Sequence, residues 1–165
     1  MHGYDVATWR TFFLAMIGTA ATLTGLLFVS VSINLDRILS GGKFLPARAR
    51  ETLASLVLIV AYSSLALVPQ KTTLLGIEIV VMAAPLLAGT LWDQLKHLKL
   101  NPTDPLLWSV SRIASTAMGT IPATLAGASL IVKWGGGFYL LVPASLLGIF
   151  GAVYSAWVLL IEIAR

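Results

Sequence analysis

Five long apolar stretches limit what this chain can fold into more than any other feature. A helix needs about 20 mostly apolar residues to cross the hydrocarbon core of a bilayer. The 165-residue chain contains five such stretches, which predict spans at about 11–35, 52–69, 72–92, 108–133 and 137–162. Charged residues make up only 11% of the chain, against roughly 25% in soluble domains. We therefore expect an all-α, polytopic transmembrane helix bundle that forms a single domain over residues 1–165.

The same composition argues against several other classes of protein. A chain that is 58% hydrophobic fits neither a water-soluble fold nor a disordered chain nor a nucleic-acid-binding domain. There is no cysteine, which excludes disulfides, thiolate metal sites and cysteine nucleophiles. The two histidines, His2 and His97, lie outside the predicted spans, and the usual nucleotide-binding and zinc-hydrolase motifs are missing. We therefore expect no enzyme activity, no cofactor, no metal and no nucleic-acid partner.

The basic residues predict how the chain is oriented. Lysine and arginine gather in the cytoplasmic loops of membrane proteins. With five spans, eight basic residues fall on the side of the C-terminus and three on the side of the N-terminus. This distribution predicts an N-terminus outside and a C-terminus in the cytoplasm. The eight are Arg37, Lys43, Arg48, Arg50, Lys96, Lys99, Arg112 and Arg165, and the three are Arg10, Lys71 and Lys133.

A stripe of mostly small residues runs along the first predicted span. Its members recur at a spacing of three and four residues, which keeps them on one face of a helix. Small residues let helix backbones approach closely in a membrane. Three interpretations stay open: tight packing inside one bundle, the lining of a pore in an oligomer, or a docking face for another protein. The stripe consists of Thr11, Ala15, Gly18, Thr22, Gly25, Ser32 and the terminal Asp36.

Glu78 is the charged residue that cannot be assigned to a loop or to a helix end. It lies six residues into the third predicted span, about 9 Å deep at 1.5 Å per residue. Ionisable groups at such depth usually face a partner or a cavity. Counting along each span places Tyr62, Ser63, Ser64 and Thr19 at the same level. Such a layer of hydroxyls predicts an ion or proton site, although a hydrogen-bonded glutamate that joins helices, or shallow exposure to solvent, explains the pattern as well.

Three segments resemble parts of a known group of proteins. They are TLTGLLFVSVSINLDRIL at 22–39, LPARARETL at 45–53 and LVPQ at 67–70. Together they resemble a family of small, multi-span integral membrane proteins of bacteria that has no established activity. The resemblance covers roughly the first 70 residues. It implies a location in the bacterial cytoplasmic (inner) membrane, and it carries over no functional residue.

Two functions fit these observations. The first is a non-enzymatic membrane protein that self-associates and forms an ion or small-solute permeation path, or an ion site, near Glu78. The second is an accessory or scaffold subunit that docks onto a larger membrane complex through its small-residue helix faces. The expected partners are therefore the lipid bilayer together with further copies of the chain or other membrane subunits.

Overall fold

The computed structural model describes residues 4–40, 44–100 and 106–164, and the regular structure within these ranges is helical. Among the described helices, five are long and apolar enough to cross a membrane, and only α2 is short. The prediction of an all-helical chain with five helices of membrane-spanning length is therefore confirmed. The helices are α1 (Val6–Ile33), α2 (Leu35–Ser40), α3 (Phe44–Leu67), α4 (Thr72–Leu100), α5 (Leu106–Val132) and α6 (Phe138–Ala164).

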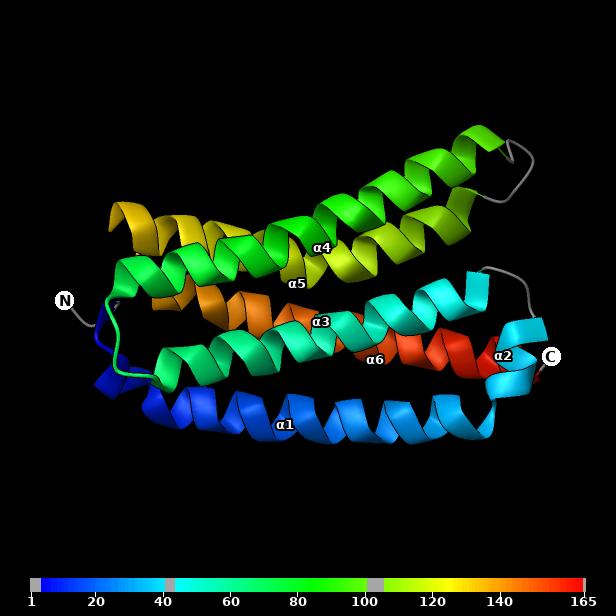
Figure 1. The fold of residues 1–165 in the computed structure, drawn as a ribbon, viewed down its shortest axis with the longest axis horizontal. Helices are drawn as coiled ribbons and strands as arrows, with labels where there is room; N and C mark the ends of the chain where they lie inside the picture. Colours follow the sequence, from blue (N-terminus) through cyan, green and yellow to red (C-terminus); the bar gives the residue numbers. More distant parts are fainter. Residues whose placement is uncertain (1–3, 41–43, 101–105, 165) are drawn as a thin grey trace.

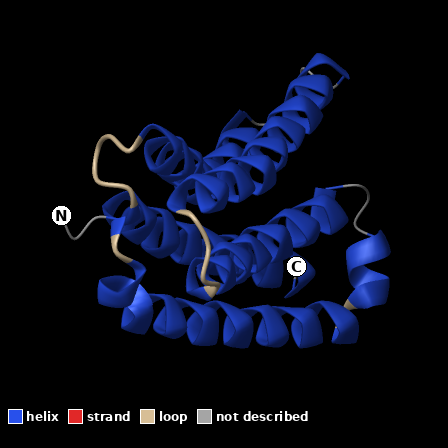
Figure 2. Cartoon of the chain, turned by 60° about the vertical axis from the view of Figure 1, so that its left-hand side comes forward, coloured by secondary structure: helices blue, strands red, loops and turns tan. Residues whose placement is uncertain are grey.

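The five long helices pack side by side in the order α1, α3, α6, α5, α4 (Figure 1). The helices α3 and α4 follow one another in the chain, yet α4 packs mainly on α5 and contacts α3 only sparsely. Toward the end of the bundle that holds the C-terminus, the α4–α5 pair diverges from α3 and α6 (Figures 1 and 2). The bundle therefore consists of an α4–α5 hairpin set at an angle on the α1, α3 and α6 helices.

Glycines hold α5 close to both of its neighbours. A Cβ atom added to Gly119 would come within 2.7 Å of the Cα of Gly148 on α6, and one added to Gly127 would come within 2.8 Å of the carbonyl oxygen of Gly76 on α4. These backbones approach too closely for any larger side chain, as small residues permit in membrane helices. The small faces of α5 and α6 therefore pack against each other.

The third helix begins earlier than the sequence predicts. The predicted span begins at about residue 52, whereas α3 begins at Phe44. Pro46 lies in the first turn, where its missing N–H costs no hydrogen bond. The extra turns bring Arg48 and Glu51 into the helix. The segment 36–51, which we expected to be a loop, therefore consists of α2 and the first two turns of α3. Residues 41–43 lie outside the described ranges.

Two other boundaries are clear. The first helix ends at Ile33, and Asn34 caps it, so Asp36 belongs to α2 and not to the first span. At the far end of the third predicted span, residues 93–100 continue α4 to Leu100. Asp104 and Pro105, a pair of residues typical of a helix start, lie outside the described residues.

Candidate functional site

A cleft of about 520 Å³ lies between α3 and α4. The α4 side of the cleft is built largely from small or apolar residues, which include Pro85, Ala88 and Gly89. Its charged residues are Arg50 and Glu51 on α3 and Asp93 on α4. The cleft therefore combines an apolar wall with charged groups drawn from both helices.

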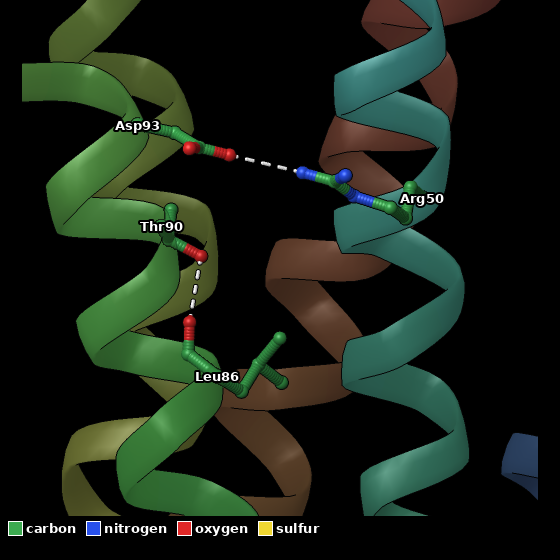
Figure 3. A network of polar contacts seen from close by, with 4 residues as sticks. All are labelled: Arg50, Leu86, Thr90 and Asp93. Carbon is green, nitrogen blue, oxygen red and sulfur yellow. Dashed lines mark hydrogen bonds and ion pairs between the residues drawn. The ribbon is translucent and has the colours of Figure 1, made fainter. Parts of the chain in front are cut away.

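An ion pair joins the two helices at this cleft. The Nη2 atom of Arg50 lies 3.0 Å from a carboxylate oxygen of Asp93 (Figure 3). The two side chains are 69% and 49% exposed, and exposed pairs of this kind contribute no more than about 1 kcal/mol. On the same part of α4, the Thr90 hydroxyl donates to the Leu86 carbonyl at 2.9 Å. The pair therefore links α3 to α4 but does not by itself hold them together.

A buried polar cluster lies on the interior face of the same stretch of α3. Arg48 is only 1% exposed, and its Nε donates to the hydroxyl of Ser155 on α6 at 3.0 Å. The Thr52 hydroxyl lies 3.0 Å from the same Ser155 oxygen and 2.8 Å from the carbonyl of Arg48. A charged side chain inside a span is rare and usually faces the interior of the bundle. The hydrogen bond that Arg48 donates to Ser155 of α6 stabilises this one.

A second polar link joins α3 and α4 at the opposite end. The side-chain amide of Gln70, in the connection between the helices, donates to Glu78 at 2.9 Å and to the carbonyl of Leu65 at 3.1 Å. Glu78 is partly buried. The carboxylate that the sequence analysis selected is therefore tied to the end of α3 by a neutral amide.

One face of α4 runs from Glu78, which binds Gln70, to Asp93, which binds Arg50. Glu78, Pro85, Gly89 and Asp93 follow one another at helical spacing, and the last three line the cleft. Fifteen residues separate Glu78 from Asp93, which is about 22 Å along a helix. Pro85 lacks the N–H that would bind the carbonyl of Val81, so this face also carries a freed backbone acceptor.

The hydroxyl groups predicted to surround Glu78 lie in different surroundings. Tyr62 is buried and shares a 2.8 Å hydrogen bond with Ser145 of α6. Ser63 is also buried, and its hydroxyl has no hydrogen-bond partner among the described residues. Ser64 and Thr19 are exposed. The structure thus joins Tyr62 to Ser145 and leaves two members of the predicted layer on the outer surface.

The small-residue stripe of α1 points away from the rest of the chain. The helix packs through Phe13, Ala20 and Leu27, which are buried. A Cβ atom added to Gly18 or Gly25 would meet nothing within 4 Å. The stripe therefore makes no tight packing contact within its own chain, and its role as a pore lining or a docking face stays a prediction. The exposed members are Thr11, Ala15, Gly18, Thr22, Gly25, Ser32 and, on α2, Asp36.

Sequence reasoning missed Arg48 and Glu51 because it placed both in a loop. A signal for Arg48 was present. Leu45, Arg48, Thr52, Ser55 and Ile59 recur at intervals of three and four residues and are all buried. The helical period of the span thus continues backward through Arg48, past the residue at which the apolar composition begins.

Neither a metal site nor a known relative adds to this geometry. No group of three His, Cys, Asp or Glu residues in the described part of the chain is arranged to hold a metal ion. Comparisons with models of protein families, with curated proteins and with solved structures found no match.

The Arg48 cluster makes a prediction about stability. Ser155→Ala removes the acceptor of a buried, charged donor, which costs about 1–3 kcal/mol. We expect the variant to unfold at a correspondingly lower denaturant concentration in mixed micelles. Ser40→Ala is the matched control, because that exposed hydroxyl donates to the carbonyl of Arg37 in its own helix and lies outside the stripe. Equal stability of the two variants would contradict the cluster's role.

Proposed function

We propose that this chain is a non-enzymatic integral membrane protein that self-associates and provides a path or a binding site for an ion or small solute between α3 and α4. The observation that carries the proposal is the cleft itself. It lies between two helices of membrane-spanning length and has charged residues in its lining. Glu78 lies farther along the same face of α4, so the path extends from the cleft toward this residue.

The acidic groups along this route would stabilise a cation. Glu51 and Asp93 stand at one end, where Asp93 is paired with Arg50, and Glu78 stands at the other, where it accepts a hydrogen bond from the neutral amide of Gln70. Between the two ends, the carbonyl freed by Pro85 offers a further oxygen. A cation that moves along α4 would therefore meet a negative or partly negative group at each stage.

The proposed orientation puts the N-terminus outside and the cleft on the cytoplasmic side. Arg48, one of the eight basic residues assigned to the C-terminal side, is buried inside α3. The remaining seven still outnumber the three on the other side, which supports the same orientation. The resemblance of the first 70 residues supports a place in the cytoplasmic membrane of a bacterium.

Glu78→Gln tests the path. We expect purified protein in liposomes to conduct a small monovalent cation, and the substitution to lower this flux by about tenfold, the effect of losing roughly 1.4 kcal/mol of stabilisation. Glu78→Asp is the matched control, because it keeps the carboxylate and should retain most of the flux. Absence of flux in the wild-type chain would contradict the permeation path, and equal flux in Glu78→Gln would contradict the role of Glu78.

A second candidate function rests on the exposed α1 stripe. A face of small residues that contacts nothing in its own chain also suits docking onto a different membrane subunit. In that case the chain would be an accessory or scaffold subunit, and the α3–α4 cleft would not conduct.

The oligomeric state separates the two candidates. We expect wild-type chains to form a homo-oligomer in native mass measurements. Gly18→Leu with Gly25→Leu should shift the mass toward the monomer by weakening association at least about tenfold, because bulky side chains prevent close helix contact. Ala128→Leu adds the same bulk at an exposed position of α5, outside the α1 stripe, and as the control it should leave the mass unchanged. A wild-type chain that stays monomeric would favour the accessory function.

A further inference from the structure

We propose that a groove between α1 and α6 binds one acyl chain of a membrane glycerophospholipid, with the ester carbonyl of that lipid at Ser30 and Trp157. The groove shares no lining residue with the α3–α4 cleft or with the α1 stripe. The lipid site is therefore distinct from the proposed path, and it requires only that the long helices cross a membrane.

Three helices form the groove. Its walls come from α1 and α6, and Leu56 of α3, which is 2% exposed, forms its floor. The two wall helices contact each other only sparsely, although both pack on α3. Leu26 and Trp157 are 64% and 60% exposed, so the groove is open to the surroundings of the bundle. The lining consists of Leu23, Leu26, Leu27, Ser30, Leu56, Ala152, Val153, Ala156, Trp157 and Leu160.

The width of the groove fits a hydrocarbon chain and not a helix. Leu23 and Ser30 lie about 10 Å apart along α1. The volume of about 290 Å³ over that length gives a cross-section of about 30 Å². A helix with side chains is about 10 Å across and needs about 80 Å². An extended hydrocarbon chain is about 4 Å wide, the contact distance of carbon atoms, and therefore fits.

The polar groups of the lining lie toward one end. Among the described lining residues, eight have aliphatic side chains, while Ser30 carries a hydroxyl and Trp157 an indole N–H. These two lie toward the end of the bundle that holds the C-terminus, and Leu23 and Ala152 lie toward the opposite end. This distribution matches an amphiphile whose chain lies deep in the membrane and whose polar group lies nearer the surface.

The depth of Ser30 matches that of a lipid ester. The 28 residues of α1 extend over about 42 Å, whereas the hydrocarbon core is about 30 Å thick. About 6 Å of a centred helix therefore lies beyond the hydrocarbon at each end. Ser30 comes three residues before the end of α1 at Ile33, about 5 Å along the axis. It lies at the hydrocarbon boundary, where ester bonds join acyl chains to glycerol.

Hydrogen bonding and close contact would favour this groove over the bulk bilayer. Lipid tails are as apolar as leucine side chains, so the hydrophobic effect supplies no preference. Walls on three helices supply additional dispersion contacts. A carbonyl oxygen has two lone pairs, so one ester can accept from both Ser30 and Trp157. An apolar side chain from another copy of the protein offers no such acceptor.

Native mass measurement of the purified full chain in mild detergent tests the lipid site. We expect each chain to retain one glycerophospholipid under conditions that remove the other lipids. Ala156→Leu fills the groove from the α6 wall and should weaken retention at least about tenfold. Ala128→Leu, exposed on α5 and outside the groove, is the matched control and should retain the lipid as the wild type does.

A milder variant decides the question if Ala156→Leu fails to fold. Trp157→Phe keeps an aromatic ring but removes the N–H, so we expect retention to weaken about threefold, the effect of one hydrogen bond. Trp134→Phe is the control, because Trp134 is 80% exposed and lies outside the groove. Equal retention by these two variants would overturn the proposal.

The remaining outcomes separate the lipid from other occupants and from the permeation path. The proposal is overturned if the wild type retains no lipid, if folded Ala156→Leu retains as much as the wild type, or if the adduct has the mass of a free fatty acid. It is also overturned if Ala156→Leu dissociates an oligomer without loss of lipid, because the groove would then join copies of the chain. If lipid is retained with the expected variant pattern but liposomes show no cation flux, the lipid site stands and the path fails.

Discussion

The close approach of α5 to both of its neighbours is the constraint on which the rest of the bundle depends. Inside a membrane, apolar surface gives little driving force for helix association, so close van der Waals contact has to supply it. Gly76 with Gly127, and Gly119 with Gly148, bring the backbones together. Because α5 binds both α4 and α6, it holds α4 away from α3 despite the short connection between them. The cleft between α3 and α4 is the consequence.

The α3 helix presents polar groups in two directions, to α6 in the interior of the bundle and to the cleft between α3 and α4. Its interior face buries Arg48 against Ser155 of α6, whereas Arg50 and Glu51, two and three residues later, line the cleft. A buried arginine is costly in a membrane protein unless hydrogen bonds compensate it. The cluster around Ser155 thus fixes how α3 is rotated about its axis. That rotation decides which residues of α3 meet α4, and so it sets the composition of the cleft.

Composition and charge were enough to predict an all-helical chain with five helices of membrane-spanning length, and they selected Glu78 as a candidate whose role stays a prediction. They could not place Arg48, because Pro46 and the preceding glycines indicated a loop where the structure has a helix start. The pairing of Arg50 with Asp93 joins residues 43 positions apart. A pattern within one helix cannot predict such a contact between two helices. The direction of the α1 stripe was also undetermined, since the small residues of one helix fit an internal and an external contact equally well.

The proposed path requires that water reach the α3–α4 cleft within the membrane. The chain has no cysteine, so single cysteines report local access without background. Ala54 lines the cleft nine residues into its span, about 14 Å along the helix, whereas Leu125 is exposed on α5 away from the cleft. In inside-out vesicles, a membrane-impermeant thiol reagent should label Ala54→Cys readily and Leu125→Cys hardly at all. An inert Ala54→Cys, or equal labelling of both variants, would contradict the account.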